Sequence, residues 1–330
     1  MSLFRTLDSL TDAGRHGVVV IGNFDGVHKG HQAVLRQARA LAQKYSDTSE
    51  PAPVTVLVFD PHPRQFFAPH APSLRLTRLV TRNALLQHYG ADHTLALTFD
   101  ADMAAMSPED FIDKIIIGAL NAKAVCVGHD FHFGKNRAGT PEMLKKYGAA
   151  NNFDVVILDA VTPDEQGARP YSSTAIRECL TRGEVRFAAK LLGHAWRLEG
   201  VVSQGDQRGR TINFPTANIE LDDYHLPLFG VYAIRTTIQT GTLAGQHFEG
   251  VANLGIRPSF ETEAPRLEVH LFDFDADIYG ETLSVALIDF IRPEQKFDGL
   301  EALKTQIAAD AEAAKKQLAV HHTLATTPTD

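Results

Sequence analysis

The chain has 330 residues, 44% of them hydrophobic, which is enough for two domains with separate cores. Its formal net charge of −8 argues against a nucleic-acid-binding surface, although a local basic pocket could still hold a small phosphorylated ligand. Only two cysteines occur, Cys126 and Cys179, and no apolar run reaches membrane-spanning length. We therefore expect a cytoplasmic protein with no nucleic-acid or membrane partner; the composition does not indicate which proteins it contacts.

Residues 18–31, VVVIGNFDGVHKGH, join a buried strand, a glycine-containing loop and the start of a helix. The β-branched run 18–21 predicts a strand covered on both faces, and apolar residues recur at helical spacing from His31 onward. The loop glycines let the backbone turn sharply and approach a ligand closely. His28 and His31 then lie at a helix N-terminus, where free N–H groups and the helix dipole favour a phosphate.

The two histidines are open to three interpretations. Imidazoles three residues apart can hydrogen-bond phosphoryl oxygens and stabilise the charge that develops at an attacked phosphorus atom. They can instead cap or pack the helix, or bind zinc with Asp25 or His62 as a third ligand. The phosphoryl interpretation is favoured, although the loop contains neither a Walker lysine motif nor a G-x-G-x-x-G turn.

Strand-like and helix-like segments alternate from residue 15 to about 183, which predicts a parallel sheet wrapped by helices. Ligands of such sheets collect at the carboxyl ends of the strands, so the loops that follow the strands should line one crevice. Capping residues followed by proline mark helix starts at Ser107 and Thr140. The expected strands are 18–21, 54–59, 94–98, 124–127 and 154–158, and the expected helices lie near 31–45, 78–89, 107–120 and 140–148.

Residues 172–177, SSTAIR, predict a second helix N-terminus with hydroxyl caps. Arg177 follows one turn later and can reach an anion bound at that terminus. Taken alone, the segment is equally compatible with a plain capped helix that carries a solvated arginine.

Beyond Trp196 the chain changes to short strand-like segments separated by turns, which predict an antiparallel barrel. Thr216 and Asn218 point to the same face of an extended chain, so their oxygens can share one Mg²⁺. Glu268 faces away from the barrel core if its apolar neighbours face inward; taken alone it could be a solvent-facing carboxylate. The expected strands are 198–203, 230–238, 248–252, 267–272 and 283–290, followed by a one-sided helix at 300–318 that closes against the barrel.

Together these segments resemble the bacterial bifunctional riboflavin kinase/FMN adenylyltransferases, also called FAD synthetases. In the first half, the resemblance rests on G-x-F-D-G-x-H-x-G-H at 22–31, F-D-P-H-P at 59–63, the loop 128–139 and the motif at 172–177. In the second half it rests on the glycine loop 205–209, F-P-T-A-N at 214–218, and the segments 226–232, 253–260, 267–272 and 277–280. The resemblance covers about residues 17–318.

The resemblance implies a Rossmann-like adenylyltransferase domain in residues 1–185, with helices on both faces of a parallel sheet. It implies a riboflavin kinase β-barrel with a closing C-terminal helix in residues 186–330. The barrel would phosphorylate riboflavin to FMN with ATP, and the first domain would transfer AMP from ATP to FMN, giving FAD and pyrophosphate. Mg²⁺ is the expected cofactor, with FMN and FAD as substrate and product rather than prosthetic groups.

Site residues follow from the motifs and the resemblance. The catalytic set is His28, His31, Arg177 and Glu268; the ATP and phosphate contacts are Gly22, Phe24, Asp25, Gly30, Ser172, Ser173, Thr174, Gly205, Gly209 and Arg210; the flavin contacts are Asp60, His62, Asp130, Asn253 and Arg257; and the metal ligands are Thr216 and Asn218. Two positions depart from the family pattern: His132 replaces a basic or small polar residue, and Asn213 replaces a glycine. Two rival hypotheses are an enzyme that retains one of the activities and a flavin-binding regulatory or carrier protein.

Asn213 provides a test of the glycine loop. Glycine at a turn commonly marks a backbone with positive φ, which asparagine tolerates and β-branched residues do not. We expect Asn213→Gly to leave riboflavin phosphorylation nearly intact and Asn213→Val to lower it strongly, while supplied FMN is still adenylylated by both variants. Chromatography of FMN and FAD measures both steps, and equal kinase activity of the valine variant would show that no such constraint exists.

Overall fold

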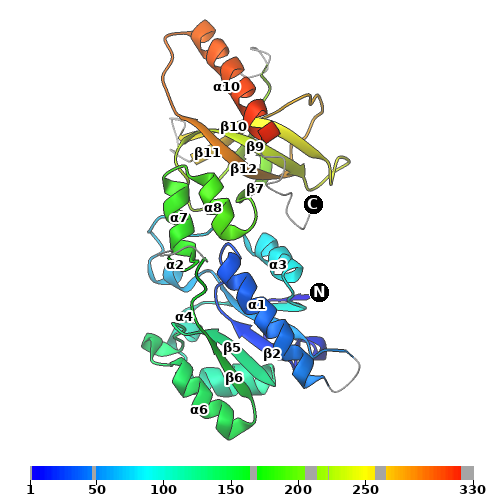
Figure 1. Ribbon diagram of the computed structural model, residues 1–330, viewed down its shortest axis with the longest axis vertical. Helices are drawn as coiled ribbons and strands as arrows, with labels where there is room; N and C mark the ends of the chain where they lie inside the picture. The colour runs from blue at the N-terminus through cyan, green and yellow to red at the C-terminus, as the bar shows by residue number, and fades with distance from the viewer. Residues whose placement is uncertain are drawn as a thin grey trace. The chain divides into compact units, whose positions relative to one another are not determined.

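The computed structural model describes residues 2–46, 50–163, 169–204, 214–221, 223–256 and 265–320. The chain folds into two compact units (Figure 1). The first unit comprises Met1–Pro72 and Leu79–Ser172, and the second comprises Ser73–Arg78 and Ser173–Asp330. Among the described residues, no helix combines the length and the apolar character that crossing a membrane requires.

The first unit is built on a six-stranded sheet, ordered β1-β4-β3-β2-β5-β6, in which all neighbouring strands are parallel (Figure 1). From β2 the chain proceeds outward through β3 and β4, then returns to place β5 on the other side of β2. This reversal of direction makes the carboxyl end of β2 the expected ligand position. The strands are β1 (Ser2–Phe4), β2 (Val18–Ile21), β3 (Val54–Asp60), β4 (His93–Thr98), β5 (Ala124–Gly128) and β6 (Asp154–Leu158).

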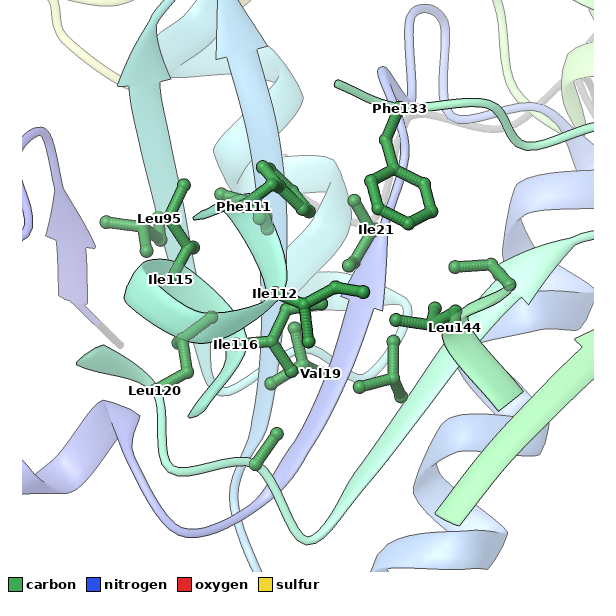
Figure 2. Packing of buried hydrophobic residues seen from close by; sticks show 14 of the residues in the cluster. Val19, Ile21, Leu95, Phe111, Ile112, Ile115, Ile116, Leu120, Phe133 and Leu144 are labelled. Carbon is green, nitrogen blue, oxygen red and sulfur yellow. The ribbon is translucent and has the colours of Figure 1, made fainter. Parts of the chain in front are cut away.

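Helices cover both faces of this sheet, as predicted, because consecutive residues of a strand point to opposite faces. Val18 and Val20 pack in a core with α1 (Lys29–Ala42) and α3 (Leu79–His88). Val19 and Ile21 pack in a second core with the π-helix η3 (Phe111–Ala119) and α6 (Pro141–Asn151), as Figure 2 shows. All four of these β2 residues are at most 4% exposed, so the strand anchors the loop that follows it.

The helix expected near 107–120 takes an unusual form. Ser107 caps a single turn, α5 (Pro108–Asp110), and the chain continues directly into η3. The N–H of Leu120 donates to the carbonyl of Ile115, five residues back, at 2.9 Å. The remaining short elements of the first unit are η1 (Asp12–Gly14), η2 (Gln43–Tyr45), α2 (Pro63–Phe67), α4 (Ala101–Ala105) and η4 (Lys135–Arg137).

The second unit contains a closed antiparallel barrel with the strand order β10-β11-β8-β7-β12-β9, which confirms the predicted barrel (Figure 1). Ala314 and Leu318 of α10 (Leu300–Val320) pack against outward-facing apolar residues of the barrel, including Val231 and Val251. The closing helix is therefore confirmed as well. The strands are β7 (Arg197–Ser203), β8 (Ala217–Glu220), β9 (Gly230–Ile238), β10 (His247–Ile256), β11 (Pro265–Leu271) and β12 (Thr282–Pro293).

The segment 73–78, which we call the strap, belongs to the second unit although its flanking residues belong to the first. The buried Trp196 donates its indole N–H to the carbonyl of Leu76 at 2.9 Å, and Arg78 forms an ion pair with Asp223 at 3.0 Å. The helices α7 (Ser173–Thr181) and α8 (Val185–Leu192) also belong to this unit. The boundary at 185/186 stays a prediction about which pieces of chain fold alone.

Replacing Trp196 tests the strap. Trp196→Phe removes the indole N–H, and with it the hydrogen bond to the Leu76 carbonyl, in a site where both residues are 0% exposed. The loss of one hydrogen bond costs about 0.5–1.5 kcal/mol, and the smaller ring adds a cavity cost. We expect the free energy of unfolding of the second unit to fall by that amount, as measured by urea denaturation followed by circular dichroism. Unchanged stability would mean that this hydrogen bond does not hold the strap.

Candidate functional site

The loop after β2 has a strained backbone. Phe24, Gly26 and Val27 all have positive φ, at 52°, 82° and 42°. The left-handed region is unfavourable for a β-branched residue, and such strain is concentrated at ligand sites. Gln32 holds the strained turn from the helix, because its buried side-chain amide donates to the carbonyl of Val27 at 2.9 Å.

His28 and His31 lie together at the start of α1, directly after this loop. His28 is the N-cap, and its Nδ1 accepts the backbone N–H of His31 at 3.3 Å. The two rings stack with centroids 3.6 Å apart, and the ring of Phe24 lies 4.7 Å from that of His31. Because Nδ1 of a neutral His28 accepts, its proton is carried on Nε2. The cap thus occupies Nδ1, one of the two ring nitrogens of His28.

The environment of His31 keeps its imidazole neutral. Burial of the ring lowers the pKa of His31 well below 6.5, and the nearby His28 and Arg82 lower it further. Its Nδ1 is buried without a hydrogen-bond partner. A buried polar atom left unpaired in this way is a common feature of a ligand site.

Two of the predicted phosphate contacts fit tightly around the histidines. A Cβ on Gly30 would lie 3.0 Å from the ring of His28 and 3.3 Å from the Cβ of Tyr171, so this position accommodates little more than glycine. Asp25 is 5% exposed within the loop. Among the residues that the structure describes, no three His, Cys, Asp or Glu side chains gather as a metal site, so the zinc interpretation gains no support.

The predicted flavin contacts of the first unit lie on the loops that follow β3 and β5. Asp60 ends β3 and faces Arg82 of α3 at 3.5 Å. His62 caps α2, with its Nδ1 accepting the N–H of Arg64 at 3.1 Å. Asp130 has an exposed side chain, and its carbonyl accepts a hydrogen bond from Nδ1 of His132 at 2.9 Å.

The predicted second helix N-terminus is α7, which begins at Ser173. Ser172 ends the first unit, whereas Ser173, Thr174 and Arg177 belong to the second. Nε of Arg177 donates to the carbonyl of Leu74 in the strap at 2.6 Å. A contact between Arg177 and the phosphates of a nucleotide stays a prediction.

Strand register brings the predicted kinase residues into one row. Glu268 on β11 is paired with Asn218 of β8 on one side and with Asn253 of β10 on the other. Directly paired residues share a face of the sheet. Leu267 and Val269, on either side of Glu268, are at most 1% exposed and face the barrel interior, so the row faces outward.

Thr216 lies just before β8, in a segment that is held against β11. Nδ1 of His270 donates to the carbonyl of Pro215 at 2.8 Å, and its ring meets that of Phe214 at 5.3 Å. Asn218 thus offers an uncharged oxygen on the strand beside Glu268, and Thr216 lies two residues before it, a donor pair that suits an ion that takes its remaining ligands from phosphate and water. The predicted residues Gly205, Gly209, Arg210 and Arg257, and also Asn213, lie outside the described residues.

Three residues that the sequence analysis did not single out hold parts of these sites: Gln32, Arg82 and His270. A signal for the first two exists in the sequence. Gln32 falls three residues before the buried Leu35 of α1, and Arg82 three residues after the buried Leu79 of α3, so both occupy apolar stripes.

The two halves of the chain match two family profiles. The FAD synthetase profile matches residues 11–175, and the riboflavin kinase profile matches residues 192–318. The order of the two matches follows the order of the two folded halves, sheet first and barrel second.

Relatives match nearly the whole chain. Proteins named bifunctional riboflavin kinase/FMN adenylyltransferase are 39% identical in Escherichia coli K12 (96% of this chain, 97% of the relative) and 37% identical in Listeria monocytogenes (92% and 93%). A crystal structure from Streptococcus pneumoniae, named there a macrolide-efflux protein, has a TM-score of 0.81 and 34% identity, covering 95% of this chain and 98% of that one. On these profiles and relatives, the chain belongs to the family of bifunctional riboflavin kinase/FMN adenylyltransferases.

Proposed function

We propose that the two activities of this enzyme, riboflavin kinase and FMN adenylyltransferase, reside at two separate sites. One site is in each folded unit. The loop after β2 performs adenylyl transfer, and the outward row on the barrel performs phosphorylation. The observation that carries the proposal is the pairing of Glu268 with Asn218 and Asn253 in one unit and the stacking of His28 on His31 in the other.

In adenylyl transfer, a phosphate oxygen of FMN forms a bond to the α-phosphorus of ATP. The bond from that phosphorus to the β-phosphate oxygen breaks, and pyrophosphate leaves. His28 and His31 donate N–H groups to the α-phosphoryl oxygens as charge builds up, without forming a covalent bond. The lowered pKa of His31 supports this role, because a neutral imidazole donates while the helix N-terminus contributes the positive potential.

Further contacts complete the proposed adenylyl transfer site. Arg177 stabilises the departing pyrophosphate through its guanidinium. The triphosphate is held by Gly22, Phe24, Asp25, Gly30, Ser172, Ser173 and Thr174, and the flavin by Asp60, His62 and Asp130.

In phosphorylation, the ribityl hydroxyl of riboflavin forms a bond to the γ-phosphorus of ATP. Glu268 accepts the hydroxyl proton as the bond from the γ-phosphorus to its bridging oxygen breaks and ADP leaves. Asn253, next to Glu268 in the row, contacts the flavin together with Arg257. ATP is bound by Gly205, Gly209 and Arg210 of the glycine loop.

Mg²⁺ is the proposed cofactor, held by Thr216 and Asn218. When bound, it neutralises charge on the ATP phosphates. The position of Asn218 beside Glu268 supports this assignment, since the hydroxyl that Glu268 would deprotonate attacks the phosphoryl group whose charge the ion would neutralise. The cytoplasm stays the predicted compartment, and the absence of nucleic-acid and membrane partners also stays a prediction.

Single substitutions should separate the two activities. We expect His28→Ala or His31→Ala to cut FAD formation by about a hundredfold or more, so that FMN accumulates from riboflavin. We expect Glu268→Gln to cut FMN formation by about a hundredfold or more, while supplied FMN is still converted to FAD. Incubation with Mg-ATP followed by chromatography of the flavins measures both steps.

Glu220→Gln is the matched control for Glu268→Gln. Glu220 lies on the neighbouring strand β8, on the same outward face two residues from Asn218, and pairs with Arg266. Its substitution should leave both activities unchanged. If one substitution abolishes both activities in a folded protein, the two-site proposal is contradicted. If the wild type converts only one of the two flavin substrates, the enzyme with a single activity is favoured. If the wild type converts neither substrate, a flavin carrier is favoured.

The lowered pKa of His31 also predicts how stability depends on pH. Below pH 6.5 the unfolded chain gains a proton at His31 that the folded chain does not bind, so this residue makes stability fall as pH falls toward its folded pKa. Urea unfolding measured between pH 5 and 7 should show that the stability of His31→Gln depends less on pH than the stability of the wild type does. An identical pH dependence in the two proteins would mean that His31 is not held neutral by the fold.

A further inference from the structure

Arg82 is a buried arginine on α3 that the proposed reaction has not used. It is 3% exposed and occupies a position on the apolar stripe of the helix, three residues from Leu79 and four from Leu86. An arginine is rarely buried to this degree unless specific partners hold its charge. Its contacts therefore indicate what the residue does.

The guanidinium of Arg82 joins two loops of the candidate site. Nη1 donates to the carbonyl of Asn23, in the loop after β2, at 3.0 Å. Nη2 lies 3.5 Å from Oδ1 of Asp60, at the end of β3. One side chain thus connects the loop that carries the histidine pair to the strand end that leads into the proposed flavin contacts.

The same guanidinium acts on His31. Burial is the main cause that lowers the pKa of His31, followed by the electrostatic effect of His28 and then that of Arg82. The carboxylates of the two segments that Arg82 joins are Asp25, in the loop after β2, and Asp60, at the end of β3. In addition, Oδ1 of Asn23 and Nδ1 of His31 are both buried without a hydrogen-bond partner, so two polar atoms beside Arg82 are unsatisfied in the folded chain.

We infer that Arg82 is a positioning residue for adenylyl transfer, which fixes the histidine-bearing loop against the end of β3 through the two arms of its guanidinium. The inference rests on the proposed role of His28 and His31. Arg82 also contributes the positive charge that disfavours protonation of His31. Its geometry matters because Phe24 and Val27 of this loop are strained and need external contacts to stay in place.

Lysine and glutamine at this position separate geometry from charge. Arg82→Lys keeps a positive charge, but a single ammonium lacks the planar fork that reaches both Asn23 and Asp60. Arg82→Gln removes the charge as well. Both variants should lower the kcat of FAD formation from FMN by about tenfold or more, because small misplacements of catalytic groups are costly. Phosphorylation of riboflavin in the same samples should be unchanged.

The pKa of His31 reports directly on the charge at position 82. It is measured by NMR titration, with the His31 resonance assigned by its absence in His31→Gln. It should rise in Arg82→Gln and stay lowered in Arg82→Lys, a result that a merely structural role does not produce. The matched control is Arg39→Gln, which breaks another arginine–aspartate pair of the first unit, Arg39 with Asp92 at 2.8 Å. This control should leave kcat and the His31 titration as in the wild type.

Two results would overturn the inference: a kcat of FAD formation at the wild-type value in folded Arg82→Lys and Arg82→Gln, or a His31 pKa that does not respond to Arg82→Gln. Circular dichroism establishes folding, and the lysine variant serves if the glutamine variant fails to fold. His31→Ala is assayed in parallel. If that variant forms FAD at the wild-type rate, the proposed role of His31 fails, whereas the titration still decides whether Arg82 acts on it.

Discussion

The hydrogen bond from the backbone N–H of His31 to Nδ1 of His28 is the interaction on which the proposed adenylyl transfer site depends. It ends the strained loop and begins α1, and it selects the ring nitrogen of a neutral His28 that carries the proton. It also brings the two rings into a stack with centroids 3.6 Å apart. Capping by His28, which the sequence left as one alternative, does not compete with the proposed phosphoryl role, because the cap uses only Nδ1 of the ring.

This arrangement needs rigid support because the loop before it is unfavourable by itself. The support comes from the buried strand β2 at one end and from α1 at the other, where Gln32 holds the carbonyl of Val27. Arg82 adds a third anchor from α3. Polar side chains placed on apolar helix stripes thus hold the backbone of the site, and their hydrogen bonds to loop carbonyls offset part of the cost of their burial.

The outward row of Asn218, Glu268 and Asn253, which is the proposed kinase site, depends on a different constraint, which is strand register. A shift of one residue between β11 and its neighbours would turn Glu268 into the barrel and Leu267 to the outside. The alternation of apolar and polar residues excludes that shift, because Leu267 and Val269 must be buried. His270 then uses the same outward face to hold Pro215, and through it the approach to Thr216.

Local patterns were sufficient for much of the fold. Runs of β-branched residues, capping prolines and the change of pattern near Trp196 predicted five of the sheet strands, the barrel and its closing helix. They missed β1 and β8, which are short, and the π-helical form of η3, whose bonds reach one residue further back than those of an α-helix. The strap was also missed, because its contacts are to residues more than a hundred positions away.

What the sequence by itself determined is which chemical groups are available and in which local structures they sit: two histidines at a helix N-terminus, a glutamate in an alternating strand, and hydroxyls before a helix. Helix and strand periodicity are local, so residues a few positions apart suffice to specify them. Only the tertiary structure decided that Asn218, Glu268 and Asn253 form one row and that Arg82 reaches both Asn23 and Asp60. Those relations depend on strand order and burial, which arise when distant segments pack together and which local spacing does not encode.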